Sequence, residues 1–258
     1  ADLSLPLGGT RPLQSQSINL DFGSLLNLQA SQANAMASPL LLELGNAPTG
    51  VDNGIRLTQP DPAGSLRIKH LQATLPVTVD DAGTLDLAGP ISGRILDLEA
   101  GNLVLSTATS LVASESLILN QQGDSRLSSS DLVVAAPSLA ISSGGDLDLQ
   151  VNTADLKVSG AGAVKIQNLS SNRSRLAVSG AGTQQFSARS ELVLDGLNTG
   201  SGDVKIDVAS GDLWLGSVHQ STAGSLTLIA ANGQIGNLSQ VQQDQRQLGA
   251  LWVYAAAD

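Results

Sequence analysis

The sequence predicts an all-β fold, a single-stranded right-handed parallel β-helix (β-solenoid) whose coils have a length of about 20 residues. Three observations support this. The pentapeptide VSGAG occurs at residues 158–162 and 178–182. Each copy follows an apolar-x-apolar triplet, whose apolar residues share one face of a strand. Glycine accounts for 27 of 258 residues and aromatic residues for 2%, which suits a narrow aliphatic interior closed by turns. A strand and turn that recur after a fixed interval are typical of a solenoid, so we expect Leu176 to stack on Leu156 and Val178 on Val158.

Residues 1–80 are the least regular part of the sequence. They hold seven of the nine prolines, each of which would interrupt a β ladder. Residues 24–38 contain neither Pro nor Gly and include several good helix formers, so the composition allows a short helix that ends before Pro39. We expect residues 1–80 to form an irregular N-terminal cap over the first coil.

Residues 81–240 carry the repeat. Residues 75–87 contain two alternating runs separated by DDAG, a pattern that predicts a hairpin. Beyond them, apolar-x-apolar pairs recur at short but variable intervals, so two or three short strands share each coil. Gly160, Gly162, Gly180 and Gly182 are interpreted as structural turn residues that supply positive φ angles at the corners.

Residues 241–258 are expected to form a C-terminal cap. Trp252 and Tyr254 lie there at alternate positions and are two of only five aromatic residues in the chain. We interpret this pair as a candidate assembly contact.

Two segments carry a resemblance to a known family. Residues 154–194 contain the recurrent SGxG between short strands and resemble the bacterial auto-transporter adhesin heads of the GIN type. Residues 200–236 contain SGD twice and are similar to filamentous-haemagglutinin-type repeats. The resemblance covers about a third of the chain. It implies a right-handed β-helix on an exported bacterial protein, secreted, at the cell surface or periplasmic, with no catalytic residues to transfer.

Charge and composition exclude several classes of partner. The formal net charge of -10 weighs against nucleic acid or an anionic membrane, because both need a cationic surface. No apolar run reaches the roughly 18 to 20 residues that span a bilayer. The chain has no cysteine, and His70 and His219 have no metal-ligand spacing, so we expect neither a metal nor a cofactor.

The strongest candidates for catalysis are Asp146 and Asp148. In GDLDL the leucines point inward, so both carboxylates project outward roughly 6.5 to 7 Å apart, near the lower end for an inverting glycosidase pair. Lys157, Lys165 and Lys205 could line a neighbouring outer face. The outer residues of a solenoid must be polar in any case, and few aromatic residues are present to stack on sugars, so we expect no enzyme.

Short polar motifs at the turns have structural interpretations. Aspartates that precede strand pairs are expected to accept hydrogen bonds from the turn backbone. They are Asp131, Asp155, Asp203 and Asp212. Three Asn-x-Ser sequons begin at Asn168, Asn172 and Asn237 and are interpreted as chance matches.

The function that these observations favour is a non-enzymatic adhesin-type or surface scaffold module that binds glycan or protein along the β-helix. One alternative is a polysaccharide lyase or hydrolase that uses Asp146 and Asp148. The other is a structural subunit that self-assembles through strand edges or the C-terminal aromatic pair.

Overall fold

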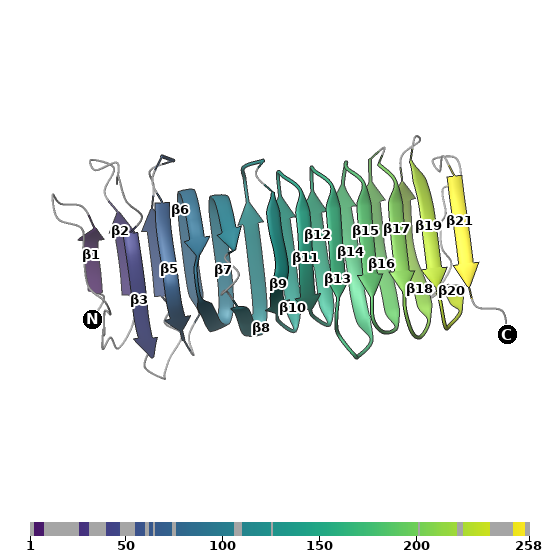
Figure 1. Ribbon diagram of the computed structural model, residues 1–258, viewed down its shortest axis with the longest axis horizontal. Helices are drawn as coiled ribbons and strands as arrows, with labels where there is room; N and C mark the ends of the chain where they lie inside the picture. The colour runs from purple at the N-terminus through teal and green to yellow at the C-terminus, as the bar shows by residue number, and fades with distance from the viewer. Residues whose placement is uncertain are drawn as a thin grey trace.

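The computed structural model describes residues 3–7, 26–30, 40–46, 55–59, 62–63, 65–73, 76–105, 110–124, 126–200, 202–220, 224–237 and 250–255. Every regular element in these ranges is a β-strand, and every strand pairing is parallel. The strands stack along one axis into a β-solenoid with about seven regular coils of roughly 20 residues (Figure 1). The predicted all-β parallel solenoid is therefore confirmed.

The strands form two long faces. Face A consists of residues 116–121 of β8 (Ser110–Gln121), β10 (Ser138–Ser143), β12 (Asp155–Gly160), β14 (Ser174–Gly180), β16 (Leu192–Thr199), β18 (Leu213–Gln220) and β20 (Ile235–Asn237). The first part of β8 pairs instead with β9. Face B consists of β9 (Leu127–Ala135), β11 (Leu147–Asn152), β13 (Val164–Asn168), β15 (Gln184–Ala188), β17 (Val204–Val208), β19 (Ser225–Ala230) and β21 (Ala250–Ala255).

The N-terminal strands continue both faces. They are β1 (Leu3–Leu7), β2 (Leu26–Ala30), β3 (Leu40–Asn46), β4 (Ile55–Gln59), β5 (Ser65–Gln72), β6 (Val77–Leu87) and β7 (Pro90–Leu105). β1, β2, β4 and β6 pair in that order, as do β3, β5 and β6. The described strands of residues 1–80 are thus regular rungs, while most of the residues between them lie outside the description. The division at residue 80, like the one at residue 241, stays a prediction.

Two local predictions were wrong. Residues 26–30 of the expected helix form strand β2, and the rest of that segment lies outside the described residues. Residues 77–87 of the expected hairpin instead form one strand, β6, that bends from face A to face B: its first half pairs with β4 and its second half with β5, both in parallel. In both cases a partner strand from a neighbouring coil decides the conformation, and local propensity cannot report that partner.

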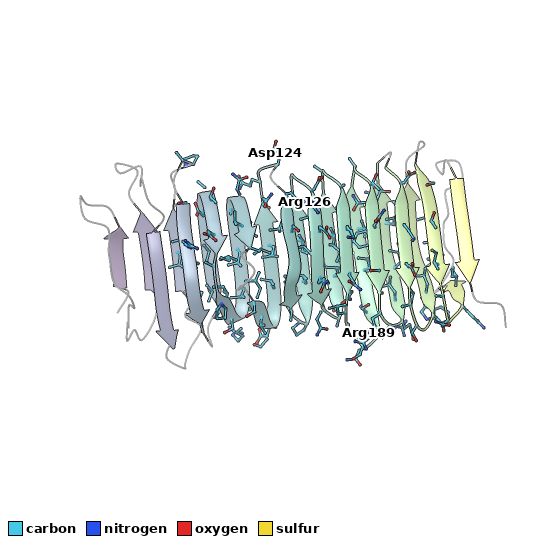
Figure 2. All side chains as sticks on the ribbon, viewed as in Figure 1. Asp124, Arg126 and Arg189 are labelled. Atoms are coloured by element: carbon cyan, nitrogen blue, oxygen red, sulfur yellow. The ribbon has the colours of Figure 1, made fainter. Side chains whose placement is uncertain are left out.

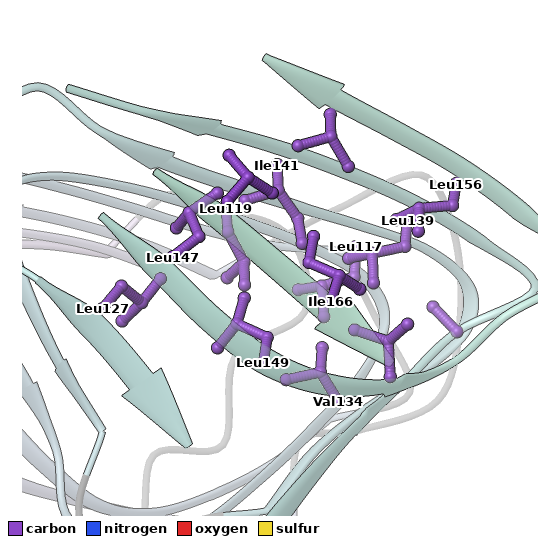
Figure 3. Close-up of a cluster of buried hydrophobic side chains, with 14 of the residues drawn as sticks. Leu117, Leu119, Leu127, Val134, Leu139, Ile141, Leu147, Leu149, Leu156 and Ile166 are labelled. Carbon is purple, nitrogen blue, oxygen red and sulfur yellow. The ribbon is translucent and has the colours of Figure 1, made fainter. Parts of the chain in front are cut away.

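The register of the VSGAG repeat is as predicted. Leu156 pairs with Leu176 and Val158 with Val178 across β12 and β14, so the two copies of the repeat are one coil apart. Similar aliphatic columns fill the interior, for example Leu117, Leu139 and Leu156 in successive coils (Figure 3). Each of these leucines is at most 4% exposed, and burying one stabilises the fold by about 1.5–3 kcal/mol.

Glycines at the corners allow successive coils to stack closely. A Cβ on Gly182 would collide with the carbonyl oxygen of Gly162, and one on Gly202 with that of Gly182. Among the four predicted turn glycines only Gly180 has a positive φ, of 155°. Gly162 and Gly182 lie in the bends between strands, whereas Gly160 and Gly180 are the last residues of β12 and β14. For Gly162 and Gly182 the requirement for glycine comes from contact with the preceding coil rather than from φ.

Polar side chains close the same corner from inside. Asp81, Gln121 and Ser143 occupy one register column, connected through Ala100. Each bonds the glycine two residues later, as when Asp81 Oδ1 accepts from the Gly83 amide at 2.8 Å. Buried backbone groups at these turns are thereby satisfied without water.

Candidate functional site

The two predicted catalytic carboxylates are held by different partners. Asp146 lies at the corner before β11, and its Oδ1 accepts a hydrogen bond of 2.8 Å from the Ala163 amide in the next coil. Asp148 projects from face B and pairs with Arg126 at 2.8 Å and with Lys165 at 3.5 Å. Arg126 precedes β9 and Arg189 follows β15, and their side chains project at opposite edges of the rod (Figure 2).

Outward residues of face B form two rows along the solenoid axis, because the parallel register repeats each position in every coil. The first row is Ser128, Asp148, Lys165, Gln185, Lys205 and Thr227. The second row is Gln150, Gln167, Ser187, Asp207 and Ile229.

These rows line an open groove of about 430 Å³, which we call the face B groove. It extends from Ser128 and Gln150 to Lys205 and Asp207, and Ile166 and Phe186 also line it. Neighbours in a row lie on adjacent strands about 4.8 Å apart, so the groove offers a polar group at each step of that length.

The centre of the groove carries amides and hydroxyls. Gln167 and Gln185 are exposed and Ser187 is half-buried. Within the described part of the chain, none of these three side chains has a hydrogen-bond partner in the protein. They are therefore free to bind a polar ligand.

The charges surround this centre in pairs. Lys165 and Lys205 lie one coil before and one coil after Gln185 in the same row. Lys165 faces Asp148, while Lys205 lies 3.8 Å from Asp207. Lys157, in contrast, lies on face A next to Ala140 and Ala177, so the structure separates it from the other two predicted lysines.

Face A carries a second, shallower depression of about 480 Å³. Its lining includes the small residues Ala140, Ala177 and Gly196, and Ile118 at one end is 40% exposed. Next to it Arg175 donates to Asp195 at 2.6 Å, and this hydrogen bond raises the pKa of Arg175. The same depression is also lined by a polar row that the register aligns one residue per coil: Asn120, Ser142, Ser159, Ser179 and Asn198. Its lining as a whole is more apolar than that of the face B groove, and Lys157 is the only charged residue among the described residues that line it.

The turn aspartates behave partly as predicted. Asp203 accepts hydrogen bonds from the backbone amide and hydroxyl of Ser225, both at 2.8 Å, and these lower its pKa. Asp212 accepts from the Gln234 amide at 2.9 Å. Both bonds run to the next coil, so these aspartates connect coils as well as cap turns. Asp155 instead faces Arg175 at 3.8 Å.

Several predicted residues lie in strands whose side chains are outside the description. They are Asp131, His70, His219, Trp252 and Tyr254. The register places Trp252 opposite Thr227 and Tyr254 opposite Ile229, at the continuation of the two face B rows. The role of this aromatic pair in assembly stays a prediction.

Gln167, Gln185 and Ser187 were not among the site residues predicted from the sequence. A signal for one row was present, because the offset between the two VSGAG copies also connects Lys165, Gln185 and Lys205. Of the sequons, Asn168 is only 5% exposed and its side chain bonds Thr153, so the folded chain hides it from modification.

Comparison with protein-family models, with curated proteins and with solved structures found no match to this chain. Among the described residues, no three Asp, Glu, His or Cys side chains are grouped so as to hold a metal ion. Nor does this part of the chain contain a helix long and apolar enough to cross a membrane.

Proposed function

We propose that this chain is a non-enzymatic, adhesin-type surface module that binds an extended glycan along the face B groove. The resemblance of residues 154–194 and 200–236 to exported adhesin repeats supports a secreted or cell-surface location. The observation that carries the proposal is the cluster of unpartnered polar side chains at the centre of the groove, Gln185 from the first row and Gln167 and Ser187 from the second.

Two parallel rows with such a cluster at their centre suit a polymer of sugars. Amide side chains both donate and accept hydrogen bonds, and sugar hydroxyls do the same. A parallel solenoid repeats its outer groups at a fixed step, so successive units of a linear glycan can meet similar groups along several coils. Weak contacts at several coils add up along one polymer, which compensates for the modest depth of the groove.

The positions of the carboxylates support a binding role over catalysis. A glycosidase needs one carboxyl group as acid and another as base or nucleophile on either side of the scissile bond. In this groove Asp148 is paired with two cations, while Asp146 accepts a backbone hydrogen bond at the corner. Both carboxylates bind groups in neighbouring coils, so each has a structural role in holding the coils together.

The binding proposal is tested with an array of linear acidic and neutral oligosaccharides. We expect binding that the triple variant Gln167→Ala/Gln185→Ala/Ser187→Ala weakens at least tenfold. The matched control is Ser159→Ala/Ser179→Ala, which removes exposed and half-buried hydroxyls from face A and should leave binding unchanged. Equal binding by all three proteins, or none by the parent, would contradict the proposal.

The non-enzymatic part has its own test. The protein is incubated with the polysaccharides that it binds, and reducing ends and unsaturated products are measured. We expect neither product. Turnover that is lost in Asp146→Ala/Asp148→Ala would replace this proposal with the lyase or hydrolase alternative.

A further inference from the structure

We infer that the face B groove selects a glycan in which a carboxylate-bearing sugar is flanked by neutral sugars, with the carboxylate bound over Gln185. The inference rests on the proposed function and names the chemical class of its ligand. It follows from the order of charges along the groove rather than from its shape.

Two ammonium groups flank one amide. Lys165 and Lys205 lie in the same row as Gln185, one strand away on each side, so each is about 4.8 Å from it along the axis. Their side chains are 69% and 48% exposed. A carboxylate over Gln185 can therefore receive a charge-assisted hydrogen bond from both sides and a neutral one from the amide.

The lysines are available for this role because their ion pairs are weak. The contact from Lys165 to Asp148 measures 3.5 Å and that from Lys205 to Asp207 measures 3.8 Å. Exposed pairs at such distances contribute little to stability. Asp148 also keeps its shorter pair with Arg126 when Lys165 turns toward a ligand.

Acidic groups limit the carboxylate to the centre. Asp148 lies one coil beyond Lys165, and Asp207 lies beside Lys205 at the other end of the groove. Asp146 and Asp203 add two further negative charges at the corner where face B strands begin, and each is bonded to the next coil. These oxygens accept hydrogen bonds from hydroxyls but repel a second and third carboxylate, so the flanking sugars should be neutral.

The net charge of the chain does not override this local arrangement. The ten excess negative charges belong to the whole chain, whereas exposed charges are screened over about 8–10 Å at ordinary salt. A carboxylate above Gln185 is nearest to the two ammonium groups. Binding should nevertheless weaken as salt increases, because both contacts are exposed.

The experiment compares three probes by titration calorimetry at two salt concentrations. Hyaluronan oligosaccharides alternate a uronate with a neutral sugar, oligogalacturonates carry a carboxylate on every unit, and dextran oligosaccharides carry none. We expect the order hyaluronan, then oligogalacturonate, then dextran. Lys165→Gln/Lys205→Gln should weaken hyaluronan binding at least tenfold and leave dextran binding unchanged.

Two further variants make the result specific. Lys165→Arg/Lys205→Arg keeps both charges and should retain hyaluronan binding within about threefold, whereas Lys157→Gln removes a lysine from face A and should have no effect. Far-ultraviolet circular dichroism checks that each variant folds.

The failures are distinguishable. Hyaluronan and dextran bound equally, with no effect of the Lys→Gln pair, would overturn the carboxylate inference and leave the glycan proposal standing. Oligogalacturonate bound as tightly as hyaluronan would overturn the requirement for neutral flanking sugars. Binding of none of the probes, nor of any glycan in the wider array, would overturn the proposed function itself.

Discussion

Asp81 is a carboxylate inside the corner of the solenoid and is only 1% exposed. It accepts hydrogen bonds from the Gly83 amide at 2.8 Å and the Leu66 amide at 3.0 Å, which link two coils. Burial outweighs these bonds and raises its pKa to about 6. At neutral pH the folded chain therefore buries a charge that the unfolded chain leaves in water.

The sign of the pH dependence follows from this shift. The pKa is higher in the folded chain than the ordinary value of 3.8, so the folded state binds the proton more tightly. The contribution of Asp81 is most favourable below pH 3.8 and is lost as the pH rises through about 6. The total change is about 3 kcal/mol, because each pKa unit corresponds to about 1.4 kcal/mol.

Comparison of the parent with Asp81→Asn isolates this contribution. The asparagine offers one acceptor oxygen, so it loses one backbone hydrogen bond at every pH. That loss shifts the free energy of unfolding by a constant amount. The diagnostic quantity is therefore how the difference in free energy between the two proteins changes with pH. Urea unfolding from pH 4 to pH 7.5 should show the parent losing stability relative to Asp81→Asn as pH rises. A difference that is constant, or that grows in favour of the parent, would contradict the buried-charge interpretation.

Glycine at position 182 is a second residue whose identity the stacking dictates. We expect Gly182→Ala to lower the free energy of unfolding by about 1–3 kcal/mol, because its methyl group meets a backbone carbonyl that cannot move aside. The matched control is Gly196→Ala on face A, where a Cβ has no neighbour within 4 Å. That change should be neutral or stabilise by up to about 1 kcal/mol. Similar losses in both variants would disprove the close-contact explanation.

At the scale of elements, buried polar side chains define the ends of the strands. Asn168 ends β13: its Oδ1 accepts from the Thr153 and Ser170 amides at 3.2 Å, and its Nδ2 donates to the Thr153 carbonyl at 3.0 Å. One side chain thus provides hydrogen-bond partners for backbone groups in the turn of its own coil and in the turn of the coil before.

Removing this side chain should destabilise the corner. We expect Asn168→Ala to cost about 2–3 kcal/mol, because buried backbone groups lose their partners. Asn198→Ala, at an exposed position of β16, is the control and should change stability by less than about 0.5 kcal/mol. Thermal or urea unfolding measures both. If the two variants are equally stable, Asn168 does not connect the coils energetically.

The sequence predicted the elements unevenly, for a physical reason. Apolar residues two apart identify a strand in the regular coils, because each coil repeats the same alternation. β2 and β6 were not predicted correctly. The sequence of a strand without Gly or Pro resembles that of a helix, and the sequence of a strand that turns a corner resembles that of a hairpin. Only the partner strand distinguishes these cases, and the register places it a full coil away along the chain.

For the whole molecule, one register extends from the interior to the outer surface. The offset that stacks Leu176 on Leu156 also aligns Lys165, Gln185 and Lys205. The same offset does not place Asp148 beside Lys165, because the coil from Asp148 to Lys165 is shorter than the coil from Lys165 to Gln185. The sequence alone does not reveal that difference in length. Coil length varies because turns differ, so the exact rows of the candidate site required the structure.

The central claim is that ligand binding takes place on face B, and NMR spectroscopy of the labelled 26.2 kDa chain tests it most directly. Hyaluronan oligosaccharide is titrated while backbone amide shifts are followed. We expect the largest changes in β13, β15 and β17, centred on Gln185, and small changes at Ala140 and Ala177 of face A. Shift changes centred on face A would contradict binding on face B. So would the absence of saturable shift changes with any glycan that the protein binds in the array.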